Sequence, residues 1–126
     1  MLSFLSVMAT IVSAHSPPSL PRIGPDGSEL LRSCGAAVRL ADGASLQPED
    51  DARAVWCIGY VSGILDALAV MNWKGGSARV CLPAKGLENN QAIRIIVKYL
   101  SEHPERLHES GRVSVVAAIG GAFLCK

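Results

Sequence analysis

The chain has 126 residues, of which 49% are hydrophobic and 18% are charged, so it can bury the core of one domain. Its 12 basic residues nearly balance 11 acidic ones, and the formal net charge is +1. This balance argues against a nucleic-acid-binding protein, which needs a basic surface that follows the phosphates. It argues equally against a polybasic membrane anchor.

The first 14 residues have the pattern of a secretion signal. An apolar run extends from Leu2 to Val12, and Val12-Ser13-Ala14 resembles a small-residue cleavage site. The run is too short to span roughly 30 Å of hydrocarbon, which requires about 20 residues. No Lys or Arg precedes it, so a frayed amino-terminal helix is the alternative. We expect a signal peptide over 1–14, an irregular proline-rich linker over 15–27 and one helical domain over 28–126, with no stable membrane insertion after cleavage.

Two helices are predicted in the first half of this domain. Asp26 or Ser28 can cap a helix that runs to about Leu40. A second helix is expected over residues 48–71, because Pro48 suits a first helical position and three acidic residues follow it. Apolar residues at helical spacing in this segment predict a central, largely buried helix with Trp56 in the core. The inward positions expected in the second helix are Val55, Ile58, Val61, Leu65 and Leu68.

Gly59 and Gly63 lie four residues apart within this second helix. Glycine costs roughly 1 kcal/mol in a helix interior, so some compensation is needed. Close approach of a neighbouring helix is the compensation that we predict. Asp66, the acid in the middle of this helix, is expected either in an exposed stripe or as a buried, hydrogen-bonded group.

The second half predicts two further helices. Residues 72–77 are expected to form a turn or loop and 79–83 an extended stretch, after which a third helix runs from about Asn89 or Asn90 to Leu100. Pro104 is expected to start the fourth helix. No long alternating run is present, so the predicted fold class is all-α, a compact bundle of about four helices. The inward positions expected in the fourth helix are Leu107, Gly111, Val115, Ala118, Ile119 and Ala122.

Four cysteines, Cys34, Cys57, Cys81 and Cys125, are dispersed over the domain with no close pair. An even, dispersed set in a short exported chain is typical of a disulfide framework, whereas zinc sites need close pairs. Four buried thiols in a cytosolic protein are the alternative. Antiparallel helices bring Cys34 to Cys57 and Cys81 to Cys125, and we predict these two disulfides.

The sequence predicts no active site, cofactor or metal site. His103 and His108 are five residues apart with Pro104 between them, so they do not form the i, i+4 pair that binds zinc. The acidic residues 49–51 are explained by the start of a helix. We therefore expect a protein that binds another protein and is not an enzyme.

Several motifs occur in a characteristic order: Cys57-Ile58-Gly59-Tyr60-Val61-Ser62-Gly63, Cys81-Leu82-Pro83, Val97-Lys98-Tyr99-Leu100, His103-Pro104-Glu105 and Ala122-Phe123-Leu124-Cys125. This order resembles the Tai-type immunity proteins of Gram-negative bacteria over roughly residues 27–125. Leu124 is a departure, since the family pattern has proline there. The resemblance implies a periplasmic, helical protein that binds and occludes a peptidoglycan amidase delivered by type VI secretion.

The shared motifs specify the scaffold, so the partner-binding residues must be sought in the loops. Trp, Arg and neighbouring polar residues in loops are typical anchors. A homodimer is also compatible with the sequence. The alternative function is a periplasmic acid-stress chaperone, a holdase that exposes apolar surface when its carboxylates and histidines are protonated. The predicted partner-binding residues are Trp73, Lys74, Arg79, Lys85 and Asn89.

Overall fold

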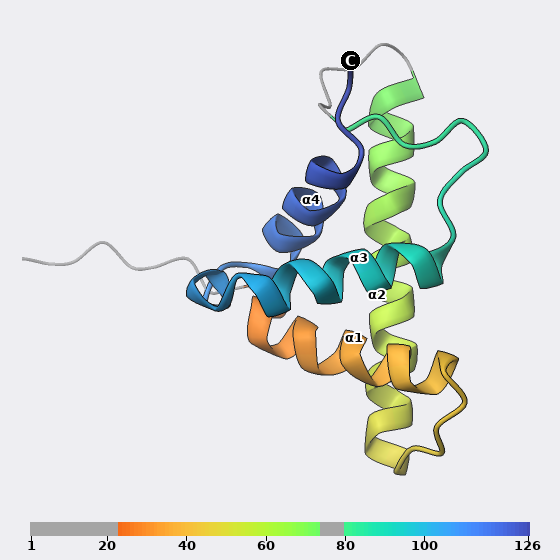
Figure 1. The fold of residues 1–126 in the computed structure, drawn as a ribbon, viewed down its shortest axis with the longest axis vertical. Helices are drawn as coiled ribbons and strands as arrows, with labels where there is room; N and C mark the ends of the chain where they lie inside the picture. Colours follow the sequence, from red (N-terminus) through yellow and green to blue (C-terminus); the bar gives the residue numbers. More distant parts are fainter. Residues whose placement is uncertain (1–22, 74–79) are drawn as a thin grey trace, which may run out of the picture.

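The computed structural model describes residues 23–73 and 80–126, and these form four α-helices and one short 3-10 turn (Figure 1). The predicted signal peptide and most of the predicted linker lie outside the described residues. Within the described ranges the only β-structure is two isolated bridges, so the all-α prediction is confirmed. The elements are α1 (Gly27–Ala41), α2 (Pro48–Trp73), α3 (Asn89–Glu102), η1 (Pro104–Arg106) and α4 (Gly111–Ala122).

The core lies where α1 and α3 cross α2, with α4 closing it near the upper half of α2 in the view of Figure 1. Each helix contributes one apolar face. Because burial of apolar area is the main force that stabilises folding, these positions fix how the helices pack. Fully buried or nearly so are Leu30, Cys34, Ala36, Ala54, Cys57, Val61, Ala92, Ile93, Ile96, Leu100, Val115, Ala118 and Ile119.

The start of α1 follows the prediction. The Asp26 side chain accepts a hydrogen bond of 2.9 Å from the backbone N–H of Glu29, which satisfies one of the unpaired amides of the first turn. Gly27 lies so close to the backbone of Leu107 that an added Cβ would be 3.0 Å from the Leu107 carbonyl oxygen. Only glycine permits this approach.

The fourth helix begins at Gly111, and the prediction that it starts at Pro104 was wrong. Residues 107–111 use their backbone groups to bind the start of α1 and so cannot continue a helix. The carbonyl oxygens of Leu107 and Glu109 accept hydrogen bonds from residues 28 and 27, and the Gly111 N–H donates to the Pro25 carbonyl at 2.8 Å. Between Pro104 and the start of α4, only the single turn of η1 is helical.

The predicted orientation of α2 was wrong in its first half. Val55 is 66% exposed, and Ile58 and Trp56 are also exposed, whereas Val61, Leu65 and Leu68 are buried as predicted. A residue advances about 100° around the helix, so a residue three positions further along lies about 60° short of a full turn. A series of positions spaced by three therefore drifts around the helix and leaves the side that faces the core. Ala54 and Cys57 face the core instead, where the Cys34–Cys57 disulfide holds them.

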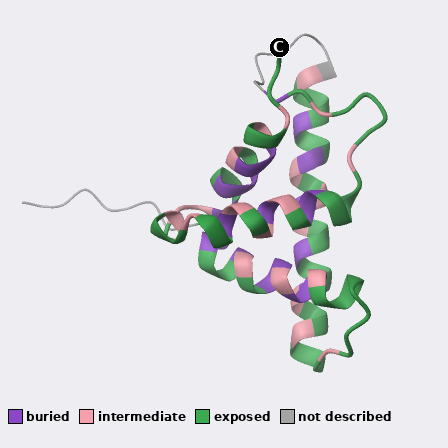
Figure 2. Ribbon diagram, viewed as in Figure 1, coloured by how far each residue is buried: buried purple, intermediate pink, exposed green. Residues whose placement is uncertain are grey.

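The prediction that α2 is largely buried was also wrong. It is the longest helix, and green, exposed positions cover much of its length in Figure 2. An added Cβ at Gly59 or Gly63 would meet nothing within 4 Å, so no other helix among the described residues approaches there and the predicted close approach was wrong. Asp66 is exposed, which matches one of the two expectations for it. Residues 48–72 are long and apolar enough to cross a membrane, a test that the core helix of a soluble protein can also pass.

Both predicted disulfides are present. Cys34 and Cys57 join α1 to α2, with a Cα–Cα distance of 5.2 Å, and both are fully buried. Cys81 and Cys125 join the segment before α3 to the carboxyl-terminal residues, with a Cα–Cα distance of 4.9 Å, and both are exposed. The two disulfides therefore have different environments, one in the core and one at the surface.

Candidate functional site

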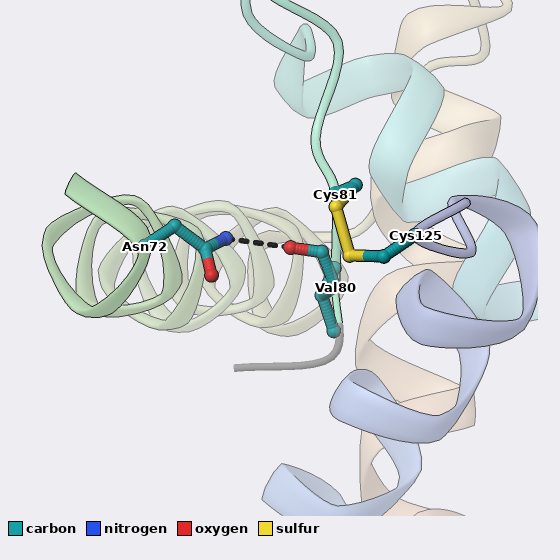
Figure 3. The surroundings of a disulfide bond; sticks show 4 residues. All are labelled: Asn72, Val80, Cys81 and Cys125. Atoms are coloured by element: carbon teal, nitrogen blue, oxygen red, sulfur yellow. Dashed lines mark hydrogen bonds between the residues drawn. A yellow bond between two sulfur atoms is a disulfide. The ribbon is translucent and has the colours of Figure 1, made fainter. Parts of the chain in front are cut away.

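Three parts of the chain meet at the carboxyl-terminal end of α2 (Figure 3). Val80 is buried and forms an isolated antiparallel bridge with Leu124, and the Cys81 N–H donates to the Phe123 carbonyl at 3.0 Å. From α2, the Asn72 side-chain amide donates to the Val80 carbonyl at 2.6 Å. Together with the Cys81–Cys125 disulfide, these contacts fix the point at which the chain enters the next loop.

The loop itself projects into solvent between this anchor and α3 (Figure 1). The Gly86 N–H donates to the Pro83 carbonyl at 2.8 Å, which closes a tight turn with Lys85 near its tip. Gly86 has a φ of 86°, a conformation that glycine adopts without strain. We refer to residues 80–90 as the binding edge, because they form an anchored loop that presents polar side chains.

Two of the five residues predicted to bind a partner lie on this edge. Lys85 and Asn89 are both exposed, the latter as the first residue of α3. Trp73 was predicted in a loop but is the last residue of α2, and that part of the prediction was wrong. Lys74 and Arg79 lie outside the described residues. The role of all five in binding stays a prediction.

Two hollows border the binding edge. An open groove of about 580 Å³ lies between α2, the Cys81–Cys125 disulfide and the turn at Pro83. A second groove of about 470 Å³ runs along the outer face of α3, where Arg94 and Lys98 are both exposed. Neither of these α3 residues could be recognised from the sequence, because exposed polar positions on a helix look alike whether or not a partner covers them.

The charges at the binding edge and along the neighbouring face of α3 are mixed. Lys85 and Lys98 contribute positive charge, Glu88 contributes negative charge, and Arg94 pairs with Asp42 at the end of α1. Such exposed charges contribute little to folding stability, but they can select a partner of complementary charge and speed its association. The edge is therefore suited to recognition of a protein surface.

The described residues contain no group of His, Cys, Asp and Glu that could hold a metal ion. His103 has a structural role: its Nδ1 is 2.7 Å from the Tyr99 carbonyl oxygen, and its ring stacks on Tyr99. The pKa of Tyr60 is raised, mainly because the phenol is partly buried, with Arg112 opposing this effect. The pKa of Arg106 is raised by its hydrogen bond to Glu109. Each of these groups is explained by local packing or pairing.

Comparison with known proteins identifies the family. The family model of Rap1a immunity proteins matches residues 26–125. The chain belongs to the Rap1a immunity protein family. The match begins at the residue that caps α1 and ends at the last cysteine, so it covers all four helices and both disulfides of this Rap1a-family protein. No curated protein and no solved structure matched the chain.

Membership of the Rap1a family implies that the chain is an immunity protein with a protein effector as its partner. It also implies an inhibitor that acts by binding. The expectation of a protein-binding immunity protein is thereby met at the level of the family.

Proposed function

We propose that this Rap1a-family protein is a periplasmic, Tai-type immunity protein that binds and occludes a peptidoglycan amidase delivered by type VI secretion. The family match over residues 26–125 is the observation that carries the proposal. The motif order of the sequence supports the amidase as the class of effector. The same proposal includes a homodimer, in which the binding edge of each copy stays free for its effector.

Two features support the periplasm. Disulfides persist in oxidising compartments such as the bacterial periplasm and are rare in the cytosol. All four cysteines of the chain are paired in two disulfides. The signal-like residues 1–14 agree with export.

The binding edge supports inhibition by occlusion. Its loop projects from the helices and is fixed at one end by the Cys81–Cys125 disulfide, so little conformational entropy is lost when it binds. A projecting, anchored loop can enter the concave active-site cleft of an enzyme. In the complex, Lys85 and Asn89 would contact the rim of the amidase cleft.

The test is a pull-down from native periplasm with the oxidised chain as bait, followed by mass spectrometry. We expect one peptidoglycan amidase, whose activity on purified peptidoglycan is abolished by stoichiometric addition of the chain. Charge reversal at the binding edge, Lys85→Glu, is expected to weaken inhibition by about tenfold or more. A charged residue in an interface steers the association of the two proteins and determines how their surfaces align. The matched control is Arg32→Glu, an exposed charge reversal on α1 outside the edge. If no amidase is recovered, the proposed effector is wrong. If the Lys85 variant inhibits as well as the native chain does, the proposed contact at the binding edge is wrong.

The alternative, an acid-stress chaperone, is favoured by one observation. Large apolar side chains of α2, including Val55 and Val70, are exposed in the folded protein. A holdase would bind many unrelated envelope proteins, and the amount bound would rise as the pH falls. A periplasmic pull-down at pH 7 and at about pH 3 separates this behaviour from the recovery of a single amidase.

A further inference from the structure

One peptide unit at the start of the binding edge is held from two sides (Figure 3). In the trans peptide between Val80 and Cys81, the carbonyl and the N–H point in opposite directions. The carbonyl accepts a hydrogen bond of 2.6 Å from the Asn72 side-chain amide, and the N–H donates to the Phe123 carbonyl at 3.0 Å. The plane of this peptide is therefore fixed between α2 and the last residues of the chain.

The hydrogen bond from Asn72 differs from the other contacts of this anchor in what it connects. The Cys81–Cys125 disulfide and the Phe123 carbonyl join the binding edge to the carboxyl-terminal residues, where Cys125 is exposed. Asn72 joins it to the last turn of α2, the helix against which α1 packs. Among the described residues, this is the only hydrogen bond between a side chain of α2 and residues 80–90.

The Asn72 amide also satisfies a carbonyl that has little access to water. Val80 is 5% exposed, and its side chain lies beside α4, where a Cβ added at Gly120 would be 3.4 Å from the Val80 Cγ2 atom. A buried carbonyl without a partner is unfavourable, so without the amide this peptide is expected to turn toward water or toward another donor.

A small rotation of this peptide becomes a large displacement at the tip of the loop. Lys85 lies five residues beyond Val80, and a chain of that length reaches at most about 17 Å. For a tip about 10 Å from the peptide, a rotation of about 20° produces a displacement of roughly 3 to 4 Å. A hydrogen bond to a partner does not survive a displacement of that size.

We propose that Asn72 is the positioning residue of the binding edge: its hydrogen bond to the Val80 carbonyl holds the edge in the orientation that the effector recognises. The inference rests on the proposed function, in which residues 80–90 bind the amidase. Without the hydrogen bond, only a fraction of the molecules has the edge in the competent orientation, and the apparent affinity falls by that fraction. Asn72 itself acts through Val80 and not by touching the effector.

The first test measures the binding edge alone and needs no effector. Amide hydrogen exchange followed by NMR gives the protection of the Cys81 N–H, which belongs to the same peptide unit as the Val80 carbonyl. Asn72→Ala and Asn72→Asp both remove the donor, and each is expected to lower this protection by about tenfold or more at pH 7. The amide of Ile96, a fully buried residue of α3, is expected to keep its native protection, which verifies that the core is folded.

The aspartate variant separates the hydrogen bond from the packing of the side chain. An aspartic acid titrates near pH 4, and a neighbouring carbonyl oxygen raises its pKa, so at about pH 3.5 the new carboxyl group is protonated in most molecules and can donate to the Val80 carbonyl. No titratable side chain of the described residues lines the groove around Asn72. Protection of the Cys81 N–H in Asn72→Asp is therefore expected to return toward the native value at about pH 3.5, whereas Asn72→Ala is expected to show no such recovery.

A matched control and a second test connect this orientation to binding. Gln47→Glu makes the same change from amide to carboxyl at an exposed residue before α2, and it is expected to behave as the native chain in every measurement. Binding kinetics are then measured with the amidase recovered by the pull-down. Asn72→Asp is expected to associate about tenfold more slowly at pH 7, with a smaller change in the dissociation rate, because the bound effector itself holds the edge in place.

Native protection of the Cys81 N–H in both Asn72 variants overturns the proposal, and so does the absence of recovery in Asn72→Asp at about pH 3.5. Reduced protection together with native association shows that the orientation of the edge does not govern binding, and the positioning role is again wrong. A change confined to the dissociation rate indicates that Asn72 touches the effector and contradicts the proposal. If no amidase is recovered, the proposed function fails, while the exchange measurements still decide whether Asn72 orients the edge.

Discussion

The different burial of the two disulfides predicts the order in which a dithiol reductant breaks them under native conditions. A thiolate must reach a sulfur atom to attack it. Cys81 and Cys125 are exposed, so their disulfide can be attacked in the folded protein. Cys34 and Cys57 are fully buried, so their disulfide becomes accessible only when the core opens. We expect the surface disulfide to be reduced first.

The magnitude follows from the stability of the fold. A domain of this size has about 5 to 15 kcal/mol of stability, and each 1.4 kcal/mol is a factor of ten in the population of the open state. If reduction of the buried disulfide requires global opening, it is slower than direct attack by at least about 10³-fold. Loss of the surface disulfide, which closes 44 residues, costs about 4 kcal/mol in the loop-entropy description. The partly reduced protein is therefore weakened, and its second disulfide is reduced faster than in the native protein.

The assay is time-resolved alkylation of free thiols followed by peptide mass spectrometry. We expect an intermediate that is labelled at Cys81 and Cys125 only. A Cys81→Ser, Cys125→Ser variant should reproduce its circular dichroism and its lower urea midpoint, and should bind the effector more weakly because the binding edge has lost its anchor. Labelling of Cys34 and Cys57 first, or of all four cysteines together at the earliest times, would refute the reasoning.

Three further changes have effects that follow from single contacts. Ile96→Ala should lower the free energy of unfolding by about 2 to 5 kcal/mol, since Ile96 is fully buried, and a loss below about 1 kcal/mol in urea denaturation would contradict its place in the core. Gly27→Ala should destabilise the protein although alanine favours helices, because its Cβ would be 3.0 Å from the Leu107 carbonyl oxygen; a raised melting temperature would argue against that close approach. Stability should fall as the pH rises above about 10, because the raised pKa of Tyr60 makes the folded state keep the phenol proton at a pH at which the unfolded state has lost it. Tyr60→Phe should reduce this pH dependence in denaturation measured from about pH 8 to 11.

The sequence was sufficient to predict the helices where local signals are strong. Asp26 caps α1, Pro48 starts α2, and the cysteines pair as expected, although α1 crosses α2 and does not run antiparallel to it (Figure 1). The cap and the helix start depend on neighbours within a few residues, and the pairing depends on the chain turning back between the two cysteines. Both can be recognised without knowing how the helices pack.

The orientation of α2 could not be predicted in the same way. Apolar residues occur all around this helix, so its hydrophobic pattern does not select one face. The Cys34–Cys57 disulfide and the small Ala54 select the face that is buried, and both effects arise from packing against α1. The late start of α4 has a similar cause, since the backbone of residues 107–111 binds a segment that is distant in the sequence.

Only part of the binding edge, and nothing of the groove beside it on α3, could be anticipated. Lys85 and Asn89 stand out because polar residues next to Gly86 and a helix start indicate an exposed loop. Arg94 and Lys98 carry no comparable signal, since a charged residue on the outer face of α3 is explained equally well by solvent. Recognition of a partner depends on the shape of the partner, which the sequence of one chain does not contain.

The contact between Pro25 and the start of α4 sets a limit on how far the amino-terminal region can be shortened. The Pro25 carbonyl accepts the Gly111 N–H, and Pro25 itself is buried. A protease that cuts after residue 14 leaves this contact intact. Removal of Pro25 and Asp26 would take away both the carbonyl that accepts the hydrogen bond from the start of α4 and the side chain that caps α1. Maturation of the protein and the design of shortened or tagged forms are thus constrained by the same two residues.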